Sequence, residues 1–344
     1  MKPIVLVTEP LASEPAQWLA KECEMIQAAP GHANFTAAAP HAQGLAIRTA
    51  TRVDAQLLDQ LPQLKVIARA GVGLDNIDLA QCKARGVRVV HTPDANTQAV
   101  VEYVLALVMD AIRPRVFLSS PLDALEWEQT RDELTATRQL NEMTFGILGL
   151  GRIGKRIANV LGTLGCKVLF HDLLTMDNSA SHGAQETSVE ELFARGDILS
   201  IHIDGRESNH AFINSSLIQR MKPNVTFINT SRGRVVNHDA LAQFLTANPG
   251  AQALLDVHDP EPFLADSPLI GMANAHLAPT TQSSCCPRHF FRSHQPKTRD
   301  RHRHRKPNQR QTCPQRHVPA SHADLRAESG RLDDSERCHQ VLHT

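Results

Sequence analysis

Short runs of β-branched and apolar residues alternate with helix-period segments from residue 3 to about residue 279. This alternation is typical of parallel sheets covered by helices, because each crossover between parallel strands needs a connection about as long as a helix. A chain of 344 residues is long enough for two domains that each bury a core. The pattern therefore predicts an α/β fold with two doubly wound parallel sheets.

The expected strands fall into two series separated by one long helix. The first series is "PIVLVT", "GLAIRT", "KVIARA" and "VRVVHT", with helices near residues 13–23 and 54–60. The apolar-periodic segment from Thr97 predicts a helix that ends before Pro114 and bridges the two domains. The second series is "TFGILGLG", "KVLFHD", "DILSIHI", "VTFINTS", "AQALLDV" and "NAHLAP". Six strands suit a complete dinucleotide-binding sheet.

The glycine pattern "GLGRIG" follows the apolar strand "FGIL" and begins a helical segment. In this context Gly149 permits a tight turn, Gly151 lets the backbone approach a pyrophosphate, and Gly154 allows close packing of helix on strand. Asp172 ends "KVLFHD", 23 residues beyond Gly149, and is placed to accept hydrogen bonds from the adenosine ribose. Its carboxylate would repel a 2′-phosphate, so NAD is favoured over NADP. The alternative is a glycine-rich turn without a ligand.

A second glycine loop, "ARAGVGLDNID", follows the strand "KVIA". Backbone amides around Val72, Gly73 and Asn76 can form a nest for a carboxylate, with Arg69 or the Asn76 side chain assisting. The alternative is a plain turn from strand to helix.

Three charged residues come at or just beyond the ends of later strands: Arg232 in "NTSRG", Asp256 in "LLDV" and Glu261 in "HDPEP". Ligands of open α/β sheets bind at the carboxyl ends of strands. An arginine there can fork onto the carboxylate and carbonyl of an α-keto acid, and a glutamate can hold an imidazole in one tautomer. Taken singly, each residue is also a plausible surface or capping charge.

The order of these motifs over residues 3–279, with "TPDANTQAVVE" between the two glycine loops, resembles the D-isomer-specific 2-hydroxyacid dehydrogenases, most closely their 3-phosphoglycerate dehydrogenase branch. The resemblance implies a Rossmann NAD-binding domain, residues 99–280, inserted in a flavodoxin-like substrate domain that begins with residues 1–98. It further implies hydride transfer between nicotinamide and a D-2-hydroxy acid, and a homodimer formed through the Rossmann domain.

The resemblance also implies roles for single residues. Arg232 binds and polarises the substrate, and Glu261 orients a catalytic histidine. Arg69, Val72, Gly73 and Asn76 take the substrate carboxylate end. The cofactor residues are Gly149, Gly151, Arg152, Ile153, Gly154, Asp172, Thr230 and Asp256, and no metal is expected.

The sequence departs from this family after Pro279. The family's strand runs into Pro-His, and that histidine exchanges the proton with the substrate oxygen, whereas Pro279 is followed here by Thr280. Residues 280–344 contain no Ile, Met, Tyr or Trp, and they hold 8 of the 18 histidines and 4 of the 7 cysteines. Such a segment is expected to be disordered. Our hypothesis is a frameshift near codon 279 or 280, which leaves residues 281–344 as an aberrant tail and impairs the enzyme.

Other interpretations of this region are weaker. Adjacent Cys285 and Cys286 and the "RHRHR" run at 301–305 do not match a structural zinc spacing. The tail's 13 Lys and Arg against 6 Asp and Glu would allow non-specific nucleic-acid binding, but no aromatic residue is interleaved with the run for stacking. His276 and His258 are the substitutes nearest to the missing imidazole, with His276 expected to point into the fold. A catalytically silent NAD-binding regulatory or scaffolding protein is the alternative function.

The remaining sequence features point to a cytoplasmic protein. The start "MKPIVLVTEP" has too short an apolar run for a signal peptide, and no apolar run is long enough to span a membrane. Cys23, Cys82 and Cys166 are scattered among apolar neighbours, as expected of reduced core thiols.

Overall fold

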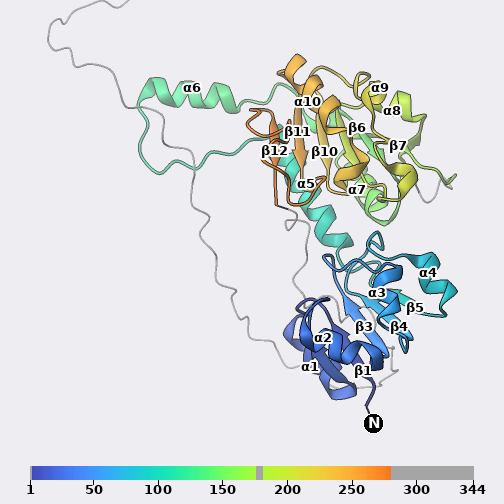
Figure 1. Ribbon diagram of the computed structural model, residues 1–344. Coiled ribbons are helices and arrows are strands. Elements are labelled where there is room, and N and C mark those ends of the chain that lie inside the picture. Colours follow the sequence, from blue (N-terminus) through green and yellow to red (C-terminus); the bar gives the residue numbers. More distant parts are fainter. Residues whose placement is uncertain (1, 176–180, 280–344) are drawn as a thin grey trace, which may run out of the picture. The chain divides into compact units, whose positions relative to one another are not determined.

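The computed structural model describes residues 2–175 and 181–279, and within these ranges the chain forms two parallel sheets (Figure 1). The first sheet has the order β2-β1-β3-β4-β5. Its strands are β1 Ile4–Val7, β2 Glu24–Gln27, β3 Gly44–Ile47, β4 Val66–Arg69 and β5 Arg88–His91. This is the flavodoxin-like order 2-1-3-4-5, which confirms the expected fold class. Residues 281–344, which are expected to replace the returning part of this domain, lie outside the described residues.

The second sheet has the order β12-β11-β10-β9-β6-β7-β8, and all its pairs are parallel. Its strands are β6 Thr144–Leu148, β7 Lys167–His171, β8 Gln185–Glu186, β9 Ile198–Ile201, β10 Thr226–Asn229, β11 Gln252–Leu255 and β12 Ala275–Leu277. Counted within the sheet, this is the Rossmann order 3-2-1-4-5-6 with one further strand beside the sixth.

Helices follow the predicted crossovers. The first sheet is accompanied by α1 Ser13–Glu22, α2 Ala33–Ala38, α3 Ala55–Asp59 and α4 Leu79–Ala84. The later helices are α5 Thr97–Ile112, α6 Ala124–Leu134, α7 Arg152–Thr163, α8 Val189–Arg195, α9 Ser215–Ile218 and α10 His238–Ala247. Single 3₁₀ turns are η1 Ala39–His41, η2 Leu140–Glu142, η4 Glu207–Asn209 and η5 Gly233–Val235. The expected helices at 13–23, 54–60 and from Thr97 to before Pro114 are confirmed.

The two faces of the second sheet bury separate cores. Residues on one face, such as Phe145 and Ile147, pack against α5 and α7. Residues on the other face, such as Leu148 and Leu199, pack against α8, α9 and α10. Within β7, Leu169 faces the second core while its neighbours face the first, which is the period of two expected of a strand buried on both faces.

Asp197 stabilises the amino-terminal edge of this sheet. Its carboxylate accepts hydrogen bonds from Arg138 and Lys222, both at 2.9 Å, and from the backbone N–H of Thr144 at 2.7 Å. These bonds tie the beginnings of β6 and β9 together and lower the pKa of Asp197 despite its burial. The carboxyl ends of the strands, at the opposite edge, remain available for ligands.

Candidate active site

The "GLGRIG" loop has the geometry that its three glycines require. Gly149 has a φ of +97°, and a Cβ there would lie 2.8 Å from the carbonyl oxygen of His202. A Cβ on Gly154 would lie 2.3 Å from the carbonyl oxygen of Gly149. A Cβ on Gly151 would meet nothing within 4 Å. The first and third glycines are therefore needed by the protein's own packing, while the second borders open space.

Helix α7 begins at this open space. Its N-cap is Gly151, which has no side chain to accept a hydrogen bond from the first turn. The free N–H groups and the positive end of the helix dipole favour an anion here. Arg152 is exposed and pairs through Nε with Oδ1 of Asp94 at 3.2 Å. Ile153 packs against the core formed with α5.

Asp172 connects the glycine loop to the end of β7. Its Oδ2 accepts the backbone N–H of Leu150, inside the loop, at 2.6 Å, and its Oδ1 accepts the N–H of Leu174 at 2.9 Å. No local sequence pattern predicts these two bonds. Each carboxylate oxygen has two lone pairs, so each keeps one acceptor position for a further donor.

The second glycine loop lies around two arginines. A Cβ on Gly71 would lie 1.8 Å from Nη1 of Arg69, and one on Gly73 would lie 2.0 Å from Nη2 of Arg232. The guanidinium groups thus occupy the space that side chains at these positions would fill. Val72, between the glycines, is half-buried.

Arg232 follows β10 and is held by its neighbours. Its Nε and Nη2 both contact Oδ2 of Asp75 at 2.8 Å, and its Nη1 donates to the carbonyl oxygen of Ser231 at 2.7 Å. Asn229 supports the turn by donating to the Arg232 carbonyl oxygen at 2.9 Å. These contacts bring the carboxyl end of β10 next to the "GVGLD" loop. Arg69 is 9% exposed, and burial and the charge of Arg232 lower its pKa.

Asn76 has a different role from the one expected of its side chain. Its Nδ2 donates to the carbonyl oxygens of Arg48 at 3.1 Å and Thr51 at 2.7 Å. Both amide hydrogens are thereby used to fix a neighbouring loop. The backbone carbonyl oxygen of Asn76 also accepts the N–H of Val53 at 2.7 Å, so most of its polar groups serve the fold.

Two buried polar residues directly follow strands β10 and β11 of the second sheet. Thr230 is 7% exposed, and its hydroxyl has no hydrogen-bond partner among the described residues. Asp256 is fully buried. Burial of Tyr103, on α5, raises the pKa of this tyrosine to about 12, and the charge of Asp256 adds to the effect. Buried polar groups at the carboxyl ends of parallel strands mark the ligand side of the sheet.

Glu261 contacts His258 through the backbone. Its Oε1 accepts the backbone N–H of His258 at 2.9 Å, while the His258 ring binds the carbonyl oxygen of Ala278 through Nε2 at 2.7 Å. His258 is therefore a buried structural histidine. The expectation that His276 points into the fold is wrong, because β12 is an edge strand and His276 is exposed on it.

Two further histidines, which no sequence pattern singled out, lie near these loops. His202 follows β9, and its Nε2 lies 2.8 Å from Oγ of Ser200. Burial lowers its pKa to about 3, so the ring is neutral at pH 7. His91 ends β5, and its Nδ1 is buried. Neither histidine belongs to a recognisable motif, so only the packed structure identifies them.

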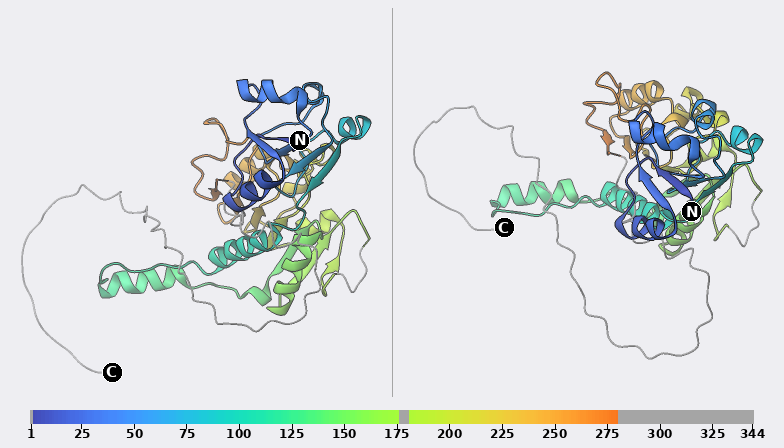
Figure 2. Two further views of the ribbon diagram at one scale, coloured as in Figure 1. Left: turned by 90° about the horizontal axis from the view of Figure 1, so that it is seen from below. Right: turned by 60° about the horizontal axis from the view of Figure 1, so that its bottom comes forward.

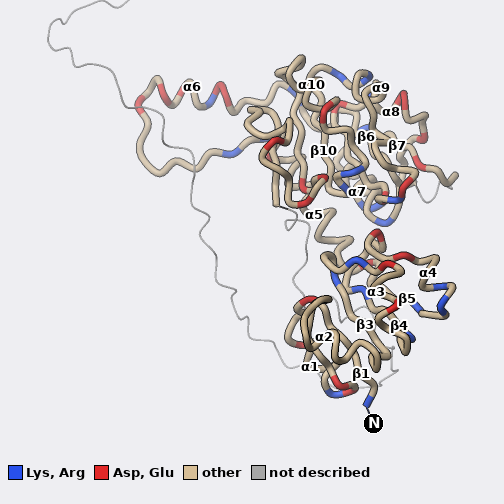
Figure 3. The backbone as a smooth tube through the Cα atoms, viewed as in Figure 1, with Lys and Arg blue, Asp and Glu red and all other residues tan. Residues whose placement is uncertain are grey.

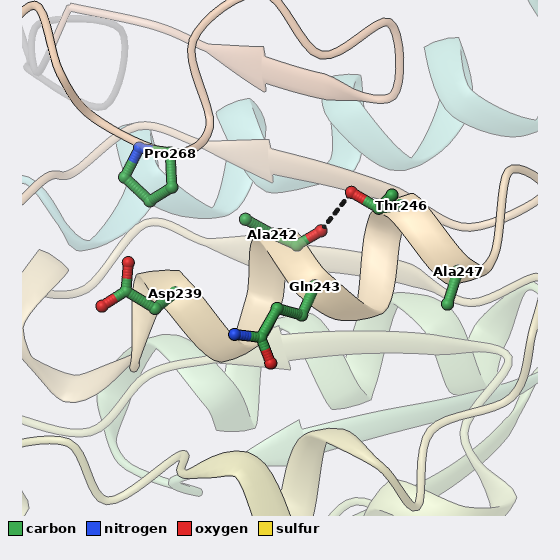
Figure 4. A pocket seen from close by; sticks show the side chains of 6 residues that line it. All are labelled: Asp239, Ala242, Gln243, Thr246, Ala247 and Pro268. Carbon is green, nitrogen blue, oxygen red and sulfur yellow. Dashed lines mark hydrogen bonds between the residues drawn. The ribbon is translucent and has the colours of Figure 1, made fainter.

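A shallow groove lies on the outer surface of α10 (Figure 4). It has a volume of about 570 Å³ and is lined by Asp239, Ala242, Gln243, Thr246, Ala247 and Pro268. None of the predicted site residues lines it.

Residues 2–175 and 181–279 include neither a metal site nor a membrane-spanning helix. They contain no group of three His, Cys, Asp or Glu side chains arranged to hold a metal ion. Among their helices, none combines the length and apolar character needed to cross a bilayer. The cysteines and the basic run considered above for metal or nucleic acid fall outside these ranges.

Known proteins resemble the chain along most of its described length. The family model "D-isomer specific 2-hydroxyacid dehydrogenase, NAD binding domain" matches residues 105–281, just over half of the chain. D-3-phosphoglycerate dehydrogenase of Mycobacterium bovis is 34% identical over 279 residues, which cover 80% of this chain and 52% of that protein. Glyoxylate reductase of Aeropyrum pernix is 31% identical over 292 residues, covering 82% of this chain and 87% of that protein.

A solved structure extends the likeness to the fold. The D-lactate dehydrogenase of Aquifex aeolicus, crystallised with NAD and lactic acid, superposes with a TM-score of 0.68 at 26% identity, covering 81% of this chain and 90% of that one. The chain spans about half the length of the phosphoglycerate dehydrogenases that it matches. Together, the matched NAD-binding domain and the two sheet orders show that the chain belongs to the D-isomer specific 2-hydroxyacid dehydrogenase family.

Proposed function

We propose that the chain is built as an NAD-dependent oxidoreductase that transfers a hydride between nicotinamide and a D-2-hydroxy acid. The observation that carries this proposal is the glycine loop, whose open position at Gly151 lies at the start of α7, with Asp172 bonded to the same loop. NAD supplies the hydride acceptor when bound. The related phosphoglycerate dehydrogenases and D-lactate dehydrogenase support the substrate class.

The cofactor site is proposed to extend along the carboxyl ends of the second sheet. The backbone around Gly149, Gly151, Arg152, Ile153 and Gly154 would hold the pyrophosphate, since this helix start carries free N–H groups. Asp172 would accept hydrogen bonds from the adenosine ribose. Thr230 and Asp256 would hold the nicotinamide end, where the buried Thr230 hydroxyl lacks a partner within the described part of the chain.

Substrate binding is assigned to the two arginines and the loop between them. Arg232 would fork onto the substrate and polarise its C2–oxygen bond, because a fixed cation stabilises negative charge that develops on that oxygen. Its ion pair with Asp75 orients the guanidinium for this role. Arg69 and the backbone of Val72, Gly73 and Asn76 would take the carboxylate end.

The proton-transfer step is where this chain departs from its family. Glu261 is proposed to orient a histidine, but the position after Pro279 holds Thr280, outside the described residues. A threonine hydroxyl is not a proton acceptor near neutral pH. We therefore propose that hydride transfer is impaired. A silent NAD-binding regulatory or scaffolding protein remains the second candidate, since that function needs no proton-transfer residue.

A frameshift would account for the loss of the histidine together with everything that follows it. In one of the two other reading frames from codon 279, the gene is expected to encode His next to Pro279, then small residues, then about 15–20 residues with apolar positions at helical spacing. Sequencing the gene provides the measurement, and a chain rebuilt in that frame should gain turnover with a D-2-hydroxy acid. If both frames soon reach stop codons, the tail is native and the silent NAD-binding function replaces the enzyme.

We also propose that the second domain, from residue 99 onward, forms a homodimer. Within it, α6 has no buried residue and stands clear of the sheet (Figure 2). Phe117, Leu125 and Trp127, on α6 and the segment before it, are 87%, 64% and 51% exposed. Acidic side chains predominate among the charges of α6 (Figure 3). Exposed apolar groups that gather in one patch commonly mark an interface, and these three residues lie close together in the sequence.

Sedimentation equilibrium is expected to show a dimer. Trp127→Glu should shift it towards the monomer, whereas Trp18→Glu, which changes a similarly exposed tryptophan in the first domain, should not. A monomeric wild-type chain would refute the dimer.

The free thiols of Cys23, Cys82 and Cys166 support the proposed cytoplasmic location.

A further inference from the structure

His91 and Arg69 form a pair at the carboxyl edge of the first sheet. They are register partners on the adjacent parallel strands β4 and β5, and each is the last residue of its strand. Register partners in a parallel pair direct their side chains to the same face of the sheet. The two side chains therefore share one side of the edge that carries the second glycine loop.

Both side chains bury a nitrogen that has no hydrogen-bond partner within residues 2–175 and 181–279. These atoms are Nε of Arg69 and Nδ1 of His91. A buried donor without an acceptor costs about 1–3 kcal/mol, and more on a charged group. Two such atoms on neighbouring strands indicate a place where a ligand, not the protein, supplies the acceptor.

Positive charges predominate around this pair. Those of Arg69 and Arg152 act on His91, and those of Arg232 and Arg48 act on Arg69, while the carboxylates of Asp75 and Glu9 act on Arg69 in the opposite sense. Burial and then the charges of Arg69 and Arg152 hold the pKa of His91 below its ordinary value of 6.5. The ring is therefore neutral in the free protein at neutral pH.

The nearby carboxylates already have partners. Asp75 pairs with Arg232 at 2.8 Å, and Asp94 pairs with Arg152 at 3.2 Å. Glu9 accepts the backbone N–H groups of residues 48–51 at 2.9–3.1 Å. No carboxylate in the described part of the chain forms an ion pair with Arg69. The positive charge beside His91 is thus left for an anion to balance.

We propose that His91 is a specificity-determining residue of the substrate site, which with Arg69 holds an oxyanion of the substrate and takes up a proton as a doubly charged oxyanion binds. This proposal rests on the substrate role proposed above for Arg69. The bound anion favours the imidazolium, so it raises the pKa of His91. By linkage, a dianion binds more tightly as pH falls from the pKa of the bound state to that of the free state.

Sulfate is a suitable probe, because it stays doubly charged throughout the titration of histidine. The full chain is titrated by NMR with sodium sulfate, and with sodium nitrate at equal ionic strength, and the His91 imidazole signal is assigned by its absence in His91→Asn. Sulfate, but not nitrate, should raise the pKa of His91 by about one, which corresponds to roughly tenfold tighter binding to the protonated ring. Equal pKa values of His91 in the two salts would overturn the proposal. This comparison is made on the wild-type chain, so it does not depend on whether a variant folds.

Two variants locate the bound sulfate. Arg69→Gln should remove the effect of sulfate on His91, while Arg152→Gln should leave it. The opposite result would place the sulfate at the glycine loop of α7 and overturn the assignment. His41, an exposed histidine on η1, serves as the matched control, because its titration should be the same in both salts.

Two hydroxy acids then show which oxyanion of the substrate is held. At a fixed pH of about 6.5, D-lactate offers one carboxylate and D-malate offers two. D-malate alone is expected to shift the protonation of His91, because the proposal requires a doubly charged anion; an equal shift with D-lactate would contradict it. A shift with neither acid, despite an effect of sulfate, contradicts the substrate role. NADH binding is measured separately, so failure of the proposed oxidoreductase function is distinguishable from failure at His91.

Discussion

The purified chain is expected to oxidise D-3-phosphoglycerate and other D-2-hydroxy acids at least about 100-fold more slowly than the same chain rebuilt in the alternative reading frame. General acid–base catalysis contributes about 10²- to 10⁴-fold in rate, or roughly 3–5 kcal/mol of barrier, and Thr280 supplies none of it. The measurement is NADH formation under saturating NAD. Retained NADH binding is the control that separates a missing proton acceptor from a collapsed cofactor site.

Thr280→His alone is expected to restore little of this activity. Glu261 can orient an imidazole only when the surrounding return segment is folded, and Glu261 here accepts the backbone N–H of His258. Substantial turnover of the unmodified chain, with a group titrating near pH 6–7, would mean that another histidine has taken the role. Variants of His258 and His276 would then identify it, with the exposed His276 as the more accessible of the two.

Gly151→Val is expected to weaken NADH binding by about 100-fold, or about 2.8 kcal/mol, without unfolding the protein. The φ of Gly151 is −74°, a value open to any residue, and its Cβ would meet no protein atom within 4 Å. A valine there thus costs the fold little, but it fills the place proposed for the pyrophosphate. NADH titration measures the loss, and thermal unfolding monitors the fold.

Gly162→Ala on the same helix is the matched control. Its Cβ would lie 3.6 Å from the carbonyl oxygen of His182, an ordinary contact, and alanine is favoured over glycine inside a helix by about 1 kcal/mol. NADH affinity should be unchanged. A Gly151→Val protein that is folded and binds NADH as tightly as the wild type would show that the cofactor does not lie on this loop.

The sequence predicted those parts of the fold whose signals are local. Alternating apolar runs identified ten of the strands, and the glycine spacing placed α7. It missed β2 and β8, whose sequences are "EMIQ" and "QE". Both are edge strands, at the ends of their sheets, so they need no continuous apolar pattern and are defined by pairing with a neighbour.

Side-chain roles were harder to predict, because they depend on contacts between residues far apart in the chain. Asp172 was correctly placed at the end of β7, but its bond to Leu150 is visible only in the structure. Asn76 donates to carbonyl oxygens 28 and 25 residues earlier, which no local pattern indicates. His91 is distinguished by burial and by its position beside Arg69 on the neighbouring strand, and the second of these joins residues 22 apart in the chain.

The central claim is that the "GLGRIG" loop and Asp172 form an NAD site. The most direct test is to titrate the full chain with NADH and with NADPH and to follow binding by nicotinamide fluorescence. Asp172 offers acceptors to ribose hydroxyls and repels a 2′-phosphate, so NADH should bind at least about tenfold more tightly, a difference of about 1.4 kcal/mol. Asp172→Ala should erode this preference. Equal affinities, tighter binding of NADPH, or no binding of either dinucleotide would contradict the account.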